Sequence, residues 1–180
     1  MAPVSQEWEP PNIPGRFIVG RPAVGGSAYH NDLVDPGAFV MSAGRPVLVV
    51  PSGVDYLDGQ RVVIAWKDTR EACRALFDAM PLLKRAKYVT VVALQDQDEP
   101  TGTQDVARYL RVHDVQATVA EQRTGGIVTA TEGLLELTSE HGADLIVMGA
   151  YGHGRLREWV FGGVTRNLLA RSPVCCLMSH

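Results

Sequence analysis

Residues 145–179 read LIVMGAYGHGRLREWVFGGVTRNLLARSPVCCLMS, and this stretch decides the fold. It holds a short apolar run, a segment with spaced glycines, a helix-like segment and a second apolar run. Apolar runs on either side of a helix are typical of parallel strands that are buried on both faces and joined by a crossover. The stretch therefore predicts a strand–helix–strand unit of an α/β sheet.

The same alternation extends upstream to residue 61. We expect strands at 61–66, 88–94, 115–120, 144–148 and 174–178, and helices at 69–85, 103–112, 127–141 and 162–171. Thr69 is placed to cap the first of these helices, and Gly142 to end the third. Such an order predicts right-handed βαβ units and a mostly parallel sheet with helices on both faces.

Residues 17–52 resemble the opening stretch. FIVG at 17–20 and RPVLVVPS at 45–52 match its two ends, and a helix is expected between them at 32–43. This first copy looks like the last third of one α/β unit. A half-unit cannot bury its own strands and helix, so we expect it to pack on the rest of the chain or on a second chain.

The remaining segments complete the predicted domain organisation. Residues 1–16 contain prolines at positions 3, 10, 11 and 14 and are expected to form an irregular arm. Residues 53–60 have turn chemistry and are expected to form a linker. Residues 61–180 form the complete unit.

Composition excludes several classes of function. The formal net charge of −3 gives no indication of a nucleic-acid partner, and the apolar runs are too short to span a membrane. Cys73, Cys175 and Cys176 fit no disulfide framework or zinc site and read as small buried side chains of a reducing compartment. The start of the chain lacks a signal-peptide pattern, so the expected location is the cytoplasm.

The glycine segment has two interpretations. Glycines let backbone N–H groups approach a phosphate, and residues 162–165 are predicted to open a helix whose free N–H groups and dipole favour an anion. His153, Arg155 and Arg157 are close enough in sequence to add polar or cationic contacts. The alternative is that Gly149 and Gly152 only shape the connection between a strand and a helix.

The spacing of the glycines carries a family resemblance. Gly149, Gly152 and Gly162 are separated by two and then nine residues, and with the continuation to His180 they resemble the second half of tandem bacterial universal stress proteins. This resemblance implies a Rossmann-like, open, twisted and mostly parallel five-stranded sheet. In one branch of the family it also implies ATP, with Mg²⁺, held by the glycine loop.

Two positions depart from the ATP-binding pattern. Members that bind ATP carry Ser or Thr after the last glycine, where this chain has Gly163; Thr165 lies two places further on. Their first strand ends in an Asp, where this chain has Lys67 followed by Asp68. The candidate nucleotide-binding residues are Ala65, Trp66, Lys67, Gly149, Gly152, His153, Gly154, Arg155, Gly162, Gly163, Val164 and Thr165.

Three functions remain open on the sequence. The first is a non-enzymatic stress-response protein that binds ATP or AMP. The second is a nucleotide-free dimerisation or scaffold protein in which the glycine loop is architecture, and the third is a related nucleotidyl-transfer enzyme, whose HxGH and SGG-type signatures are missing. No catalytic or metal-binding residue is predicted.

The resemblance also implies how chains pair. Members of the family associate through their last strands, antiparallel across a two-fold axis. We therefore expect strands 46–50 and 174–178 to pair antiparallel, either within one molecule as a pseudo-dimer or in a homodimer.

Overall fold

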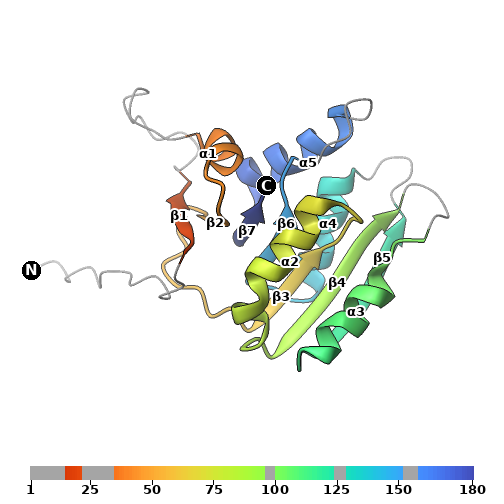
Figure 1. Cartoon of the computed structure of the whole chain (residues 1–180). Coiled ribbons are helices and arrows are strands. Elements are labelled where there is room, and N and C mark those ends of the chain that lie inside the picture. Colours follow the sequence, from red (N-terminus) through yellow and green to blue (C-terminus); the bar gives the residue numbers. More distant parts are fainter. Residues whose placement is uncertain (1–14, 22–34, 96–99, 124–128, 152–157) are drawn as a thin grey trace, which may run out of the picture.

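The chain is shown here as a computed structural model, which describes residues 15–21, 35–95, 100–123, 129–151 and 158–180 (Figure 1). The elements found in these residues are, in chain order, β1 (Phe17–Gly20), α1 (Pro36–Ser42), β2 (Val47–Val50), β3 (Arg61–Ala65), α2 (Arg70–Leu83), β4 (Tyr88–Gln95), α3 (Thr103–Val112), β5 (Ala117–Arg123), α4 (Ala130–Glu140), β6 (Leu145–Gly149), α5 (Glu158–Arg171) and β7 (Cys175–Ser179). The strands form one sheet with the order β1-β2-β7-β6-β3-β4-β5.

The sheet confirms the predicted α/β class and is larger than the five strands of one unit. Six neighbouring pairs of strands hold it together, and five of them are parallel. The exception is β2 with β7, which run antiparallel with Leu48 opposite Leu177. The two strands of the half-unit therefore extend the sheet beyond β7, and the expected pairing of strands 46–50 and 174–178 occurs within one molecule.

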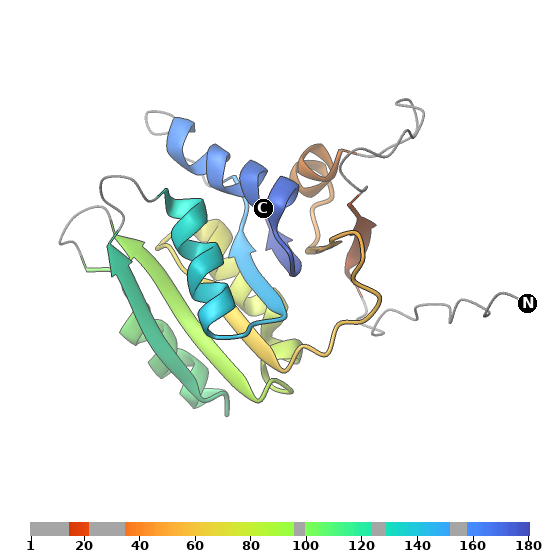
Figure 2. The same cartoon turned by 180° about the vertical axis from the view of Figure 1, so that it is seen from behind.

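Helices cover both faces of the sheet. α2 and α3 pack on one face, where Leu76, Leu83 and Leu110 join the buried side chains of one core cluster (Figure 1). α1, α4 and α5 pack on the opposite face, where Leu134 and Leu168 belong to a second cluster (Figure 2). Because β6 and β7 are buried on both faces, they are apolar except for Ser179 at the end of β7, as the sequence indicates.

Local sequence signals explain most boundaries. The Thr69 hydroxyl accepts from the Ala72 N–H, as expected for the cap of α2. The chain turns out of α4 at Gly142, whose φ of +56° is a conformation that glycine adopts without strain. α4 begins later than predicted because Thr129 and Glu132 form a reciprocal capping box there.

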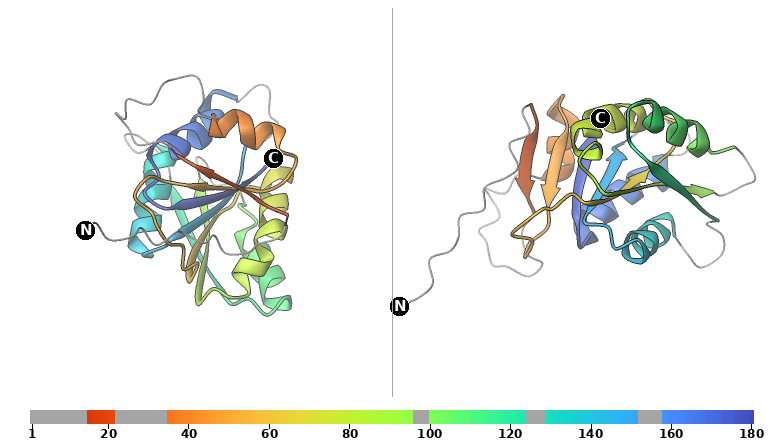
Figure 3. Two further views of the ribbon diagram at one scale, coloured as in Figure 1. Left: turned by 90° about the vertical axis from the view of Figure 1, so that its left-hand side faces the viewer. Right: turned by 90° about the horizontal axis from the view of Figure 1, so that it is seen from below.

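The half-unit is held against the rest of the chain by hydrogen bonds as well as by the sheet. The Arg74 guanidinium, on α2, donates to the carbonyls of Gly44 at 3.1 Å and of His180 at 3.0 Å. Arg16 donates to the carbonyl of Asp78, also on α2. Leu57, in the predicted linker, is buried in the same cluster as Leu48. The side views in Figure 3 show β1 and β2 lying next to β7.

The half-unit and the end of the chain are related by an approximate two-fold axis. β1–α1–β2 has the connectivity of β6–α5–β7, because in each case two parallel neighbouring strands are joined by a helix. Both helices contribute to the same core cluster, and β2 meets β7 antiparallel. The axis therefore runs perpendicular to the sheet, as in a symmetric pair of identical surfaces.

The cysteines are free thiols, and two of them are deeply buried. Burial raises the pKa of both Cys175 and Cys176 to about 11, so they stay protonated near neutral pH. Cys73 is half-buried, and desolvation raises its pKa as well. None of the helices in the described residues is long and apolar enough to cross a membrane.

Candidate functional site

The topology marks one place on the sheet as the expected ligand site. The chain leaves β3 through α2 toward β4, whereas it leaves β6 through α5 toward β7 on the other side. The strand order therefore reverses between β3 and β6, whose carboxyl ends lie together because Ala65 is in register with Met148. In open parallel sheets, ligands bind in the crevice at such a switch point.

The residues at the carboxyl end of β3 and just after it differ in their exposure. Ala65 is half-buried and Lys67 is exposed at the edge of the sheet. Trp66 packs on the core cluster of the α2 face, and its indole N–H donates to the Thr101 carbonyl at 3.0 Å. Trp66, named above as a candidate nucleotide-binding residue, therefore holds the segment before α3 in place.

A hydrogen-bond cluster fixes the same segment to β5. The hydroxyls of Thr101 and Thr103 both donate to one oxygen of the Glu121 carboxylate, and the bond from Thr103 measures 2.5 Å. These two bonds lower the pKa of Glu121, because they stabilise its charged form. The cluster joins the start of α3 to the carboxyl end of β5 beside the switch point.

Glu71 is a buried acidic residue at this edge that is not among the residues predicted for the site. It lies in the first turn of α2, its side chain is 3% exposed, and its carboxylate pairs with Arg70 at 3.0 Å. A carboxylate there interacts favourably with the helix dipole. An acidic residue in a first helical turn is readable from sequence, but its burial depends on packing against β6 and is not.

Gly149 is required by the contact between α2 and β6. A β-carbon at this position would lie 2.5 Å from the backbone nitrogen of Ala72 and 2.7 Å from the carbonyl carbon of Glu71. Backbone atoms cannot move aside as the end of a side chain can, so only glycine fits here. The first glycine of the segment therefore has a steric explanation that involves no ligand.

Tyr151 connects the glycine segment to the half-unit. Its backbone has a φ of +53°, which is uncommon for a residue with a side chain. The ring packs on the core cluster to which α1 and α5 contribute. Its hydroxyl oxygen would be only 2.5 Å from a β-carbon added at Gly37. Burial, and then the nearby charge of Asp35, raise the pKa of the Tyr151 phenol. Position 151 is thus held by the N-terminal half-unit.

We expect Gly37→Ala to lower the free energy of unfolding by about 1 kcal/mol, because its methyl group would stand 2.5 Å from the Tyr151 hydroxyl and the packed ring must shift to make room. Tyr151→Phe removes that oxygen, so the double variant is expected to recover most of the loss. Urea unfolding of the four proteins in a double-mutant cycle measures this coupling. Strictly additive effects would show that the two residues do not contact each other.

The start of α5 differs from the prediction. The helix begins at Glu158, four residues before Gly162, so residues 162–165 lie inside it. Beyond the first turn of a helix, each N–H group bonds to the carbonyl four residues earlier. The N–H groups of residues 162–165 therefore do not form a free amino-terminal anion site. The prediction that the glycine pair at 162–163 opens the helix is therefore wrong, since glycine lowers helix propensity without excluding a helix.

The residues after Gly162 have different surroundings. A β-carbon on Gly163 would meet no heavy atom within 4 Å, so this position is open. Val164 packs against the core cluster of the α5 face, and Thr165 is 2% exposed. The Thr165 side chain therefore faces the protein interior and is not placed to contact a ligand from solvent.

The structure thus brings together only part of the predicted site. Ala65, Trp66, Lys67 and Gly149 gather at the ends of β3 and β6. Gly152, His153, Gly154 and Arg155 lie outside the described residues. Within the described part of the chain, no three His, Cys, Asp or Glu side chains are arranged to hold a metal ion.

Comparison with known proteins gives a consistent result. The model of the universal stress protein family matches residues 60–180. A universal stress protein from Archaeoglobus fulgidus DSM 4304 aligns with a TM-score of 0.61 and 21% identity, over 76% of this chain and 50% of its own. A universal stress family protein from Burkholderia pseudomallei has 19% identity and a TM-score of 0.48, over 67% of this chain and 96% of its own. The chain thus spans half the length of the Archaeoglobus protein, and comparison with curated proteins gives no match.

Proposed function

Because the chain belongs to the universal stress protein family, we propose that it is a non-enzymatic stress-response protein that binds ATP where β3 and β6 end. One observation carries the proposal: the glycine segment that resembles a phosphate-binding loop leaves the sheet at its topological switch point. AMP is a smaller ligand for the same site, and Mg²⁺ would accompany ATP.

The charges at this edge favour phosphate at its outer rim. Lys67 and Arg70 are exposed cations that flank the amino terminus of α2. The buried Glu71 carboxylate already lies in the first turn of that helix, so a phosphate would repel it if placed deeper. We therefore assign phosphate contacts to Lys67 and to the backbone of the glycine segment, with Arg155 as the cation that the sequence adds.

We expect any hydrolysis of ATP to be slow. Rapid phosphoryl transfer needs a residue that orients the nucleophile and carboxylates that hold Mg²⁺ near the phosphates. The sequence shows neither arrangement, since Asp68, Glu71 and Asp105 do not have the spacing of paired acid–base carboxylates. Binding, and the conformational or partner change that follows it, would then be the output.

Thermal unfolding with and without millimolar Mg-ATP tests the proposal. Ligand at about 100 times its dissociation constant adds about 2.7 kcal/mol of stability, which is roughly 5–10 °C for a chain of this size. We expect a rise of this order with ATP, a smaller one with AMP and none with GTP. No rise with any nucleotide at millimolar concentration would overturn the proposal.

Gly163→Ser, assayed by the same unfolding series, separates a ligand site from inherited architecture. The open surroundings of Gly163 accept a hydroxymethyl group, and this is the position where ATP-binding members carry Ser or Thr. If ATP binds here, the added hydroxyl is expected to raise its affinity about tenfold, as a hydrogen bond to a charged group would. Gly163→Ala adds the same β-carbon without the hydroxyl and serves as the matched control.

The second candidate is a nucleotide-free scaffold protein. It is favoured by Gly149, whose presence is explained by the contact between α2 and β6 alone. In that case Gly163→Ser would leave nucleotide affinity undetectable, and the surfaces offered to other chains would carry the function.

Three further inferences, on domain organisation, location and association, accompany this proposal. We divide the chain into an arm at 1–16, a partial unit at 17–52, a linker at 53–60 and a complete unit at 61–180. We infer a cytoplasmic location, which the free thiols support because they are typical of a reducing compartment. Because β2 occupies the edge of β7, we infer that the usual last-strand homodimer is replaced by the internal pairing.

A further inference from the structure

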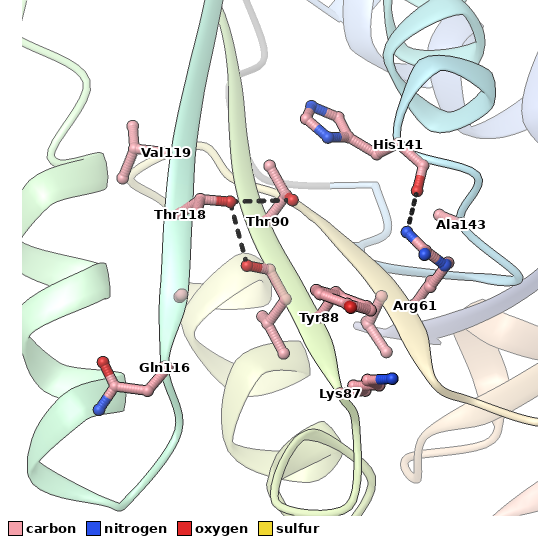
Figure 4. Close-up of a pocket in the computed structure, with 12 residues that line it drawn as sticks. Arg61, Lys87, Tyr88, Thr90, Gln116, Thr118, Val119, His141 and Ala143 are labelled. Carbon is pink, nitrogen blue, oxygen red and sulfur yellow. Dashed lines mark hydrogen bonds between the residues drawn. The ribbon is translucent and has the colours of Figure 1, made fainter.

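A groove lies on the opposite end of the sheet from the candidate nucleotide site. It has a volume of about 550 Å³ and is lined by the amino-terminal parts of β3, β4 and β5 and by the segment after α4 (Figure 4). We propose that this groove binds a small organic anion, namely a planar apolar ring that carries one carboxylate or phosphate group. The volume is within the range of small-molecule sites.

The groove exists because α4 does not cover the whole of its face. The helix ends at Glu140, and the chain turns back into the sheet through His141 and Gly142. Beyond this end, Thr118 of β5 is exposed, and Tyr88 of β4 is 47% exposed. The amino-terminal parts of β4 and β5 thus present a face that a ligand can reach.

The charges lining the groove are all of one sign. Arg61 and Lys87 are exposed, and none of the twelve lining residues is Asp or Glu. Both cations lie by the Tyr88 ring, with the Arg61 guanidinium 4.4 Å and the Lys87 ammonium 5.5 Å from its centre. In a chain with a net charge of −3, this local excess of positive charge favours an anion.

Arg61 is held in position before any ligand arrives. Its backbone N–H and that of Gln60 donate to the two Asp144 carboxylate oxygens, at 3.2 and 3.3 Å. Its guanidinium lies over Tyr88 and donates to the His141 carbonyl at 3.4 Å, which leaves most of its five N–H donors for other acceptors. A fixed guanidinium loses little freedom on binding, so more of the interaction appears as affinity.

The uncharged residues that line the groove can contact the ring of the proposed ligand. Thr90 is buried, and its hydroxyl lies 3.1 Å from that of Thr118 in the next strand, which adds polar groups across the groove (Figure 4). Ala143 adds apolar surface and the Tyr88 ring adds a planar one, whereas the side chains of Ala117 and Val119 pack into the core on the opposite face of the sheet. Cations at one side and an aromatic, partly apolar wall together select an anion attached to a flat ring.

Amide NMR of the full chain, titrated with benzoate and with phenyl phosphate, tests the proposal. We expect saturable shifts at residues 61–62, 87–90, 116–119 and 141–143, with dissociation constants on the order of millimolar for ligands of this size. Inorganic phosphate and benzyl alcohol, which carry the charge or the ring alone, are expected to bind at least about fivefold more weakly. Shifts with benzoate alone would identify a carboxylate ligand, and shifts with phenyl phosphate alone a phosphate.

Matched charge variants decide whether the groove itself is responsible. Arg61→Gln and Lys87→Gln are each expected to weaken binding at least about fivefold, because each removes a charge-assisted contact. Arg108→Gln removes the same charge from α3, where Arg108 pairs with Asp105 at 2.8 Å outside the groove, and is expected to change nothing. Absent shifts at 20 mM ligand, shifts that survive Arg61→Gln, or shifts confined to the ends of β3 and β6 would overturn the proposal.

Discussion

Gly149→Ala is expected to lower the free energy of unfolding by about 2–4 kcal/mol, a large fraction of the stability of an ordinary domain. The added methyl group would stand 2.5 Å from the Ala72 nitrogen and 2.7 Å from the Glu71 carbonyl carbon. It can be accommodated only if α2 moves away from β6. That movement would also disturb Glu71, which is buried at this contact.

Gly163→Ala is the matched control for this prediction. The same chemical change at an open helical position is expected to raise stability by about 0.5–1 kcal/mol, because alanine has the higher helix propensity. Urea unfolding followed by circular dichroism gives both values. An unchanged midpoint for Gly149→Ala would mean that α2 and β6 separate at little cost, and that Gly149 has to be explained by a ligand.

The opposite signs expected for these two glycines bear on the function of the segment. Spaced glycines are usually taken as a single signal for phosphate. Here Gly149, the first glycine of the pattern, is required by packing, whereas Gly163, which directly follows its last glycine, is not. A nucleotide site at this edge therefore depends on the open positions and on Lys67, and the number of glycines alone does not establish it.

The sequence predicted the class of fold because its strongest signals are local. The apolar run at β6 and the amphipathic pattern of α3 depend on neighbours in the chain, and α3 has the predicted bounds of 103–112. The cap at Thr69 joins two residues that are only three positions apart. The antiparallel pairing of β2 with β7 was also expected, but from the family resemblance, which implies association through the last strands, and not from a local pattern.

The rest depends on contacts between distant segments, which no local pattern contains. The burial of Glu71 comes from β6, and the position of Tyr151 comes from Gly37, more than a hundred residues away. Leu57 lies in a segment with turn chemistry, yet it completes the core beside Leu48. α5 begins earlier than predicted because the glycine pair at 162–163 lowers helix propensity without ending the helix.

Leu48→Asp is expected to detach the half-unit and to expose the edge of β7. Leu48 is 1% exposed and stands opposite Leu177, so the substitution places a carboxylate in a fully apolar site. The loss of burial and the desolvation of the charge together amount to about 4 kcal/mol or more. Hydrogen exchange is expected to accelerate in β1, β2 and β7, while β3 and β4 stay protected.

The exposed β7 edge would then have an unpaired row of backbone donors and acceptors beside the apolar side chains of Cys176 and Leu177. Because β2 pairs with β7 around a two-fold axis, a second copy of β7 could occupy the same place, and we expect light scattering to show a new dimer.

Ile18→Asp, on the partly exposed strand β1, introduces the same charge at 39% exposure and is expected to leave both the exchange and the mass unchanged. Uniform loss of protection in Leu48→Asp would instead show that the half-unit and the complete unit unfold as one cooperative body. Retained mass with a protected β7 would show that the half-unit stays docked despite the charge. A new dimer would identify residues 17–52 as an internal substitute for a second copy of β7, since detaching them would then allow two chains to associate through this edge.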